Sequence, residues 1–88
     1  MKIEYDLEKS QHNFNTRGLT FEQVSHFQFA TAIIEVDNRT NYGEMRFNAI
    51  GYIGRRLHHL TYTLREDAVR VISLRKANLR EIKRYANT

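Results

Sequence analysis

The sequence predicts a two-layer α+β fold, with helices packed on one face of a mostly antiparallel sheet. Three observations lead to this prediction. The chain has 88 residues, enough for one domain spanning residues 1–88 and too few for two. Several β-branched segments follow one another closely after residue 30, as in a meander of strands. Amphipathic helical patterns lie before and after these segments.

The N-terminal segment predicts a short strand followed by a helix. Residues 2–5 alternate polar and apolar side chains, which is typical of a strand. Asp6 is placed to cap a helix that runs to about Thr16. Gly18 is placed to end that helix.

The middle of the chain predicts a second helix and then another strand. Thr20 and Gln23 form a capping-box pattern ahead of an apolar stripe at helical spacing, made of Phe21, Val24 and Phe27. Residues 31–36 are rich in β-branched side chains, and turn-forming residues follow them at 37–41. We therefore expect a strand that ends near residue 36.

Three more strands and a last helix complete the expected order, β-α-α-β-β-β-β-α. The strands cover residues 46–53, 57–64 and 69–74. Asn78 and Glu81 form a second cap pattern, ahead of an amphipathic stripe at Leu79, Ile82 and Tyr85. Alternation along the last strand predicts that Arg70 shares a face with Leu74 and Lys76, opposite Ser73 and Arg75.

Basic charge is concentrated in the second half of the chain. Residues 1–45 hold four basic and seven acidic side chains, a net charge of −3, whereas residues 46–88 hold ten and three, a net charge of +7. Such a concentration of cations attracts nucleic acid or an acidic protein partner. A solvated cationic surface is the alternative explanation of the same charge.

Composition also excludes several classes of protein. The chain has no cysteine, which excludes disulfides and thiolate chemistry. No apolar stretch approaches the ~18 residues of a membrane span, and no signal segment follows Met1. We therefore expect a cytoplasmic protein.

Short motifs in a fixed order along nearly the whole chain resemble those of a known family. They are Asp6, Lys9, Asn13, Gly18, Thr20-Phe21, Asp37-x-Arg39, Tyr42-Gly43-Glu44-x-Arg46, Gly54-Arg55-Arg56-Leu57, Tyr62-Thr63-Leu64-Arg65 and the segment from Arg70 to Ala77. In these motifs the sequence resembles the BrnT family, the ribonuclease toxins of bacterial type II toxin–antitoxin systems. One departure is Thr16-Arg17 before Gly18, where the family has Lys-His and therefore a histidine acid or base.

The resemblance implies a RelE-like fold and cleavage of RNA. It also implies a BrnA-type antitoxin that binds DNA, so that the pair represses its own operon. A dimeric antitoxin would give a 2:2 assembly. The competing function is a catalytically silent basic module that holds an antitoxin or contributes to operator binding, and the Thr16-Arg17 departure favours it.

Cleavage of RNA without a metal uses the 2′-hydroxyl of the substrate, and it needs a base, a cation for the phosphorane and an acid. The acidic residues are scattered, with no pair spaced for a two-metal site, so we expect no metal and no cofactor. Glu44 is the candidate base, and it points to the same side as Arg46 if the strand begins at Glu44, although an orienting salt bridge is equally compatible with this spacing. Arg75 and Lys76 are candidate transition-state cations, and Tyr62 is a candidate proton donor or stacking residue.

Further residues complete the expected site. The basic residues expected to bind RNA are Lys9, Arg56, Arg65 and Arg70. His12 lies one helical turn after Lys9, and it would replace the missing family histidine if the first helix borders the site. The alternative for His12 is a surface histidine with no role.

Overall fold

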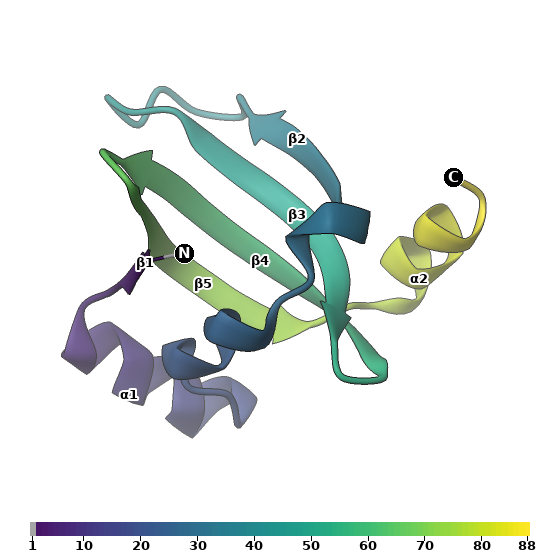
Figure 1. The fold of residues 1–88 in the computed structure, drawn as a ribbon, viewed down its shortest axis with the longest axis horizontal. Coiled ribbons are helices and arrows are strands. Elements are labelled where there is room, and N and C mark those ends of the chain that lie inside the picture. Colours follow the sequence, from purple (N-terminus) through teal and green to yellow (C-terminus); the bar gives the residue numbers. More distant parts are fainter. Residues whose placement is uncertain (1) are drawn as a thin grey trace.

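The computed structural model describes residues 2–88 and has a five-stranded sheet in the order β1-β5-β4-β3-β2 (Figure 1). The strands are β1 (Lys2–Glu4), β2 (Ile33–Asp37), β3 (Arg46–Ile53), β4 (Arg56–Arg65) and β5 (Ala68–Lys76). The helical elements are α1 (Leu7–Arg17), the 3₁₀ helices η1 (Phe21–His26) and η2 (Phe29–Thr31), and α2 (Leu79–Ala86). β1 pairs with β5 in parallel and the other three strand pairs are antiparallel, so the sheet is mixed. The α+β class is confirmed.

The predicted ends of α1 are confirmed. The Asp6 carboxylate accepts a hydrogen bond from the backbone N–H of Lys9 at 3.1 Å, which satisfies one of the free amides of the first turn. Gly18 has a φ of 75°, and its N–H donates to the carbonyl of Phe14 at 2.8 Å. This left-handed conformation is the reason that glycine ends the helix.

The prediction of a second α-helix is wrong, because the segment forms two short 3₁₀ helices instead. Thr20 makes no side-chain cap, and the N–H of Phe21 donates instead to the hydroxyl of Ser10 at 2.9 Å. The apolar stripe has a strict spacing of three residues, and a 3₁₀ helix aligns every third residue on one side. The stripe therefore fits the tighter helix, whose Phe21 and Val24 are each only 1% exposed.

The sheet has an apolar face and a polar face. The apolar face packs against η1 and η2 and comprises Phe47, Ala49, Leu60, Tyr62, Val69, Val71 and Leu74. The polar face carries Arg46, Asn48, Thr61, Thr63, Arg70, Ser73 and Arg75. Contrary to the expectation that all helices share one sheet face, α2 packs on the polar side, where Tyr85 contacts Tyr52 near Ile50.

A β-bulge in β5 determines which side chains of that strand face the core. Thr61 pairs with Ser73 and Tyr62 pairs with Val71, so Ile72 is an extra residue without a partner on β4. The bulge reverses the alternation, and Arg70 pairs with Thr63 on the polar face. The predicted sharing of a face by Arg70 and Leu74 is therefore wrong.

The side chain of Asn13 closes the open edge of β5 beyond the short strand β1. Its amide donates to the carbonyls of Leu74 and Leu19, both at 2.8 Å, and its oxygen accepts from the N–H of Leu74 at 3.5 Å. Asn13 is 8% exposed and thus occupies the place that a further strand would take. These contacts hold α1 against the edge of the sheet.

Asp37 and Arg39 stabilise the end of β2. Both carboxylate oxygens of Asp37 accept hydrogen bonds from the guanidinium of Arg39 at 2.8 Å, and the side chain of Asp37 is 1% exposed. The hydrogen bonds from Arg39 hold the pKa of Asp37 at about 2, well below its usual value.

Replacing Asn13 should destabilise the fold because two carbonyls lose their donor. We expect Asn13→Ala to lower the free energy of unfolding by about 1–3 kcal/mol, the range for a buried polar group left unsatisfied. Urea unfolding measures this change. The matched control is Asn15→Ala on the exposed side of the same helix, which should change stability by less than about 0.5 kcal/mol. Equal effects of the two changes would contradict the role given to Asn13.

The buried carboxylate of Asp37 should make the stability of the fold depend on pH in the acidic range. Its pKa is about 2 in the folded state and about 3.9 when unfolded, so its contribution is present above pH ~4 and is lost as the pH falls toward 2. We expect the melting temperature of the wild type to fall more steeply across this window than that of Asp37→Asn. The control is Asp67→Asn in the exposed β4–β5 turn, which should follow the wild type. If the melting temperatures of the wild type and Asp37→Asn fell in parallel with pH, Asp37 would not be the source of the pH dependence.

Candidate functional site

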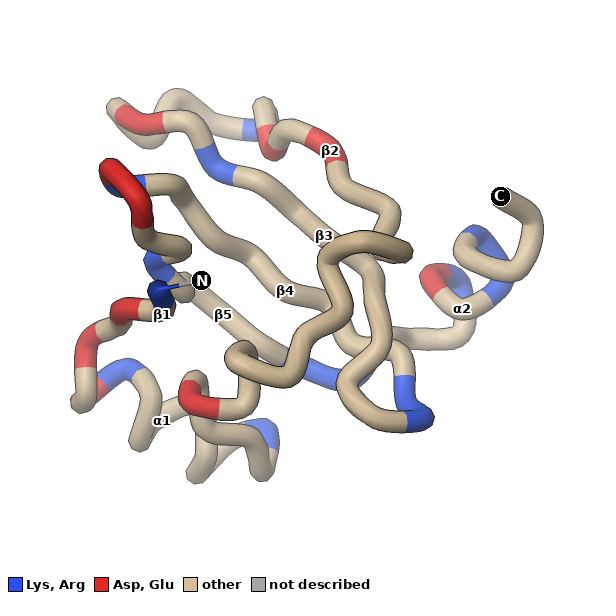
Figure 2. The backbone as a smooth tube through the Cα atoms, viewed as in Figure 1, with Lys and Arg blue, Asp and Glu red and all other residues tan. Residues whose placement is uncertain are grey.

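Charged side chains gather where β3, β4 and β5 reach one end of the sheet. Figure 2 shows basic positions at the start of β3, at the end of β4 and in β5, with acidic positions in the β4–β5 turn. The ion pairs of residues 2–88, at this end and around α2, fall into two groups, and the distances separate those that hold the fold from those that leave a cation available.

The first group consists of three bidentate pairs that stabilise the structure. In addition to Arg39–Asp37, they are Arg75–Glu81 at 2.8 and 2.9 Å and Arg84–Glu35 at 2.9 and 2.8 Å. Two parallel hydrogen bonds use two of the five N–H donors of a guanidinium group and fix its orientation against the carboxylate. Glu81 also accepts from the N–H of Asn78 at 2.9 Å, which completes the predicted capping box of α2.

The second group surrounds a small groove that we call the basic groove. Glu44 lies between Arg46 and Arg65, with nearest N–O distances of 3.7 and 3.6 Å, and Arg70 lies 3.7 Å from Glu4. These distances exceed those of hydrogen bonds, so the guanidinium groups keep their donors free. The groove has a volume of about 190 Å³ and is lined by Asp6, Lys9, Glu44, Arg46, Thr63, Arg65, Arg70, Val71 and Ile72.

Arg46 is the most constrained cation of the basic groove. Its guanidinium carbon lies 3.9 Å from the ring centre of Tyr42, a cation–π contact that orients the group. Its Nε atom is buried and has no hydrogen-bond partner among residues 2–88. A buried donor without an acceptor is costly unless a ligand supplies one, and a phosphate oxygen is a suitable acceptor.

The structure brings together five of the nine predicted site residues in this groove. These residues are Lys9, Glu44, Arg46, Arg65 and Arg70. The closeness of Glu44 and Arg46 in the sequence was the clearest signal for it, although Glu44 lies just before β3. Sequence reasoning missed Asp6 and Ile72 as lining residues, because α1 and the bulge reach the groove only through tertiary packing.

The other four predicted residues lie elsewhere. Tyr62 is 5% exposed on the apolar face, stacked on Phe47, and burial raises its pKa. Arg75 is held by Glu81. Its neighbour Lys76 points to the opposite face of β5, and its backbone register partner on β4 is His58. Arg56 lines a separate hollow at the β3–β4 turn. Arg75 and Lys76, predicted together as transition-state cations, therefore lie on opposite faces of β5.

His59 is a further buried polar group on the polar face. Its side chain is 16% exposed, with Nε2 3.8 Å from Glu81 and Nδ1 without a hydrogen-bond partner. Burial, followed by the charge of Arg75, lowers its pKa, whereas Glu81 opposes this effect. The imidazole is consequently neutral at pH 7.

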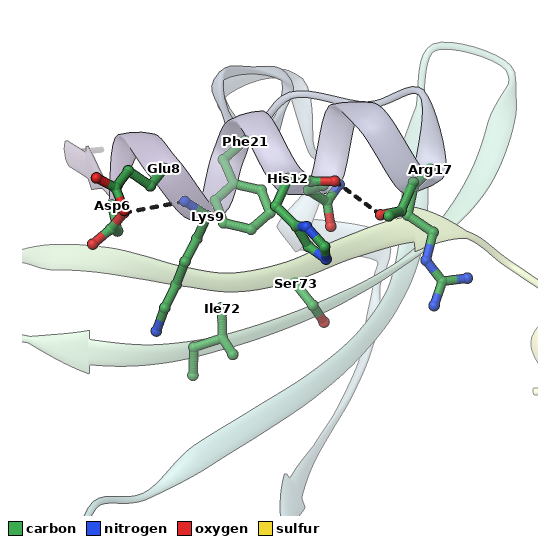
Figure 3. Close-up of a pocket in the computed structure, with 10 residues that line it drawn as sticks. Asp6, Glu8, Lys9, His12, Arg17, Phe21, Ile72 and Ser73 are labelled. Carbon is green, nitrogen blue, oxygen red and sulfur yellow. Dashed lines mark hydrogen bonds between the residues drawn. The ribbon is translucent and has the colours of Figure 1, made fainter.

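A larger groove lies between α1 and β5, and we call it the α1–β5 groove (Figure 3). Its volume is about 500 Å³, and its lining includes Lys9, His12, Thr16, Arg17, Phe21 and Ser73. The sequence carried a signal for it, since Lys9, His12 and Thr16 recur at helical spacing on one side of α1.

Two searches of residues 2–88 for other kinds of site gave negative results. No three His, Cys, Asp or Glu side chains among them gather to hold a metal ion. None of the helices in this part of the chain has the length and apolar character needed to cross a membrane.

Comparison with known proteins identifies the family. The family model described as "Ribonuclease toxin, BrnT, of type II toxin-antitoxin system" matches residues 5–81. This range covers most of the chain, from the end of β1 into α2. A search of curated proteins gave no match. The chain belongs to the BrnT family of ribonuclease toxins of type II toxin–antitoxin systems.

Proposed function

We propose that this protein is an endoribonuclease that cleaves messenger RNA by metal-independent attack of the 2′-hydroxyl, with the basic groove as its active site. The observation that carries this proposal is one carboxylate, Glu44, held loosely among the cations that line the groove. RNA cleavage needs a base beside groups that stabilise negative charge on phosphorus, and this groove offers both.

Glu44 takes the proton of the 2′-hydroxyl as the 2′ oxygen attacks phosphorus. Arg46 and Arg70 stabilise the phosphorane through charge-assisted hydrogen bonds. The bond to the 5′ oxygen then breaks, leaving a 2′,3′-cyclic phosphate and a 5′-hydroxyl. Lys9, the one amine among the lining residues, is the candidate donor of the proton that the leaving oxygen takes.

The loose ion pairs are suited to exchange with substrate. A partly exposed pair at 3.6–3.7 Å contributes only about 0–1 kcal/mol, so a phosphate displaces it at little cost. The bidentate pair between Arg75 and Glu81 is shorter and holds α2. We therefore place the transition-state cations at Arg46 and Arg70 rather than at Arg75 and Lys76.

Membership in a type II family implies a protein antitoxin as partner, and we propose a BrnA-type antitoxin that covers the basic groove. Met45 lies between Glu44 and Arg46 in sequence and is 61% exposed, so it offers an apolar contact near the cations. On this proposal operator DNA is bound only through the complex, a 2:2 assembly with a dimeric antitoxin. The compartment is the cytoplasm, and the fold is RelE-like.

A catalytically silent module is the second candidate. The observation that favours it is Thr16-Arg17 in place of the family Lys-His. Such a protein would bind its antitoxin through the same surface without cleaving RNA.

Cleavage of labelled RNA by the purified protein distinguishes these functions. We expect products that form equally with and without a chelator, and a single-turnover rate about 10²–10³-fold lower for Arg70→Ala, the usual loss for one transition-state donor. Lys76→Ala, on the opposite face of β5, and Arg55→Ala, at the exposed β3–β4 turn, are matched controls that should retain most of the rate. Thermal unfolding checks that each variant folds.

Three other outcomes would count against parts of the proposal. Products that disappear with the chelator would contradict the metal-free reaction. No products at any dose would favour the silent module. A large loss for Lys76→Ala with little loss for Arg70→Ala would move the site away from the basic groove.

A further inference from the structure

The α1–β5 groove has features of a binding site that the proposed chemistry does not use. Figure 3 shows Lys9, His12 and Arg17 in order along α1, with Ile72 and Ser73 of β5 across from them. At about 500 Å³ it lies within the range of roughly 300–1,000 Å³ for sites that hold a small ligand. Its size exceeds that of the basic groove, where the cleavage is placed.

The two grooves adjoin each other. Asp6, Lys9 and Ile72 line both of them, so Lys9 stands at their junction. Ile72 is the extra residue of the bulge, which places its side chain at the same junction. A strand of nucleic acid whose phosphate lies in the basic groove therefore has a direct path into the α1–β5 groove.

The cations of the α1–β5 groove are free to bind an anion. Within residues 2–88, neither Lys9 nor Arg17 forms an ion pair of 4.0 Å or less. Lys9 and Arg17 are eight positions apart, which corresponds to about 12 Å along α1 at a rise of 1.5 Å per residue. The acidic side chains Asp6 and Glu8 lie at the far end from Arg17, and the Asp6 carboxylate faces the N–H of Lys9.

The groups between these cations suit a nucleobase. The imidazole of His12 provides an aromatic ring, and Ile72 provides apolar surface. The hydroxyl of Ser73 provides a polar group beside them. RNA recognition commonly stacks an unpaired base on an aromatic side chain and binds the base edge with polar groups.

We propose that the α1–β5 groove is a subsite for one unpaired nucleotide of the RNA strand, next to the phosphodiester in the basic groove. Lys9 and Arg17 pair with the phosphates on either side, and His12 contacts the base. This inference rests on the proposed function, because it takes RNA as the substrate. It assigns to Arg17 a binding role at a position where the family has histidine.

Binding of an RNA that resists cleavage tests the subsite. The probe is a short fluorescent single-stranded RNA with 2′-fluoro in place of each 2′-hydroxyl, and its affinity is measured by anisotropy at several salt concentrations. We expect Arg17→Ser to weaken binding and to reduce the slope of log affinity against log salt by about 0.7, as for one lost phosphate contact on a single strand. We expect His12→Ala to weaken binding about fivefold or more, with the slope unchanged.

Two substitutions of the same kinds elsewhere on the surface are the controls. Arg55→Ser removes an arginine at the β3–β4 turn, and His26→Ala removes an exposed histidine of η1. Both should retain the affinity of the wild type, apart from a small uniform effect of charge for Arg55→Ser. If the controls weaken binding as much as the groove variants, or if the groove variants bind as the wild type does, the subsite is overturned.

Failure of the subsite and failure of the proposed function give different results. If Arg17 and His12 contribute to binding of the probe but natural RNA is never cleaved, the subsite stands and the ribonuclease proposal falls. If natural RNA is cleaved and both groove variants bind the probe normally, the subsite alone falls. If the wild type does not bind the probe at any salt concentration, the subsite is overturned as well.

Discussion

The extra residue Ile72 in β5 is the constraint on which both the core and the basic groove depend. Val71 and Leu74 are three positions apart, and both face the core only because the bulge between them reverses the alternation. Without the bulge, Val71 and Leu74 would point to opposite faces. If Leu74 kept its place in the core, Val71 would turn to the polar face and Arg70 would turn inward. Burial of an unpaired guanidinium is strongly unfavourable, so the register of β5 and the position of Arg70 are determined together.

The polar face uses similar ion pairs for two purposes, and distance distinguishes them. Arg75 and Arg84 each hold a glutamate through two short hydrogen bonds, which fix α2 to the sheet. Arg46 and Arg65 share the single carboxylate of Glu44 at longer distances. Cations of the first kind are structural, whereas those of the second kind retain donors for a substrate. The number of basic residues in the sequence does not distinguish structural cations from those available to a substrate.

Much of the fold could be predicted because its signals are local. Asp6, Gly18 and the pair Asn78 and Glu81 mark helix ends through contacts within one or two turns of chain. The 3₁₀ helix at Phe21–His26 was mistaken for an α-helix because a spacing of three fits both. The parallel pairing of β1 and the bulge at Ile72 depend on partners far along the chain, and nothing in their own residues marks them.

The site was predictable in part for the same reason. Glu44 and Arg46 are two residues apart and lie 3.7 Å from each other, but β3 begins at Arg46, so strand alternation does not position Glu44. Strand alternation separates the neighbours Arg75 and Lys76, and it places Tyr62 with Leu60 on the apolar face. The prediction of Arg75 and Lys76 as joint cations and of Tyr62 as a site residue therefore conflicted with a pattern that the sequence contained. The contribution of α1 to the grooves, through Lys9 and His12, follows from the contacts of Asn13 with β5 and was not readable locally.

The most direct measurement is a crystal structure of the protein bound to an RNA in which the 2′-hydroxyl at the mapped cleavage position is replaced by hydrogen. We predict that the phosphate at this position lies within hydrogen-bonding distance of Arg46 and Arg70, with Glu44 facing the 2′ carbon. A phosphate bound instead beside Lys76 or Arg56, with the basic groove unoccupied by RNA, would contradict the account.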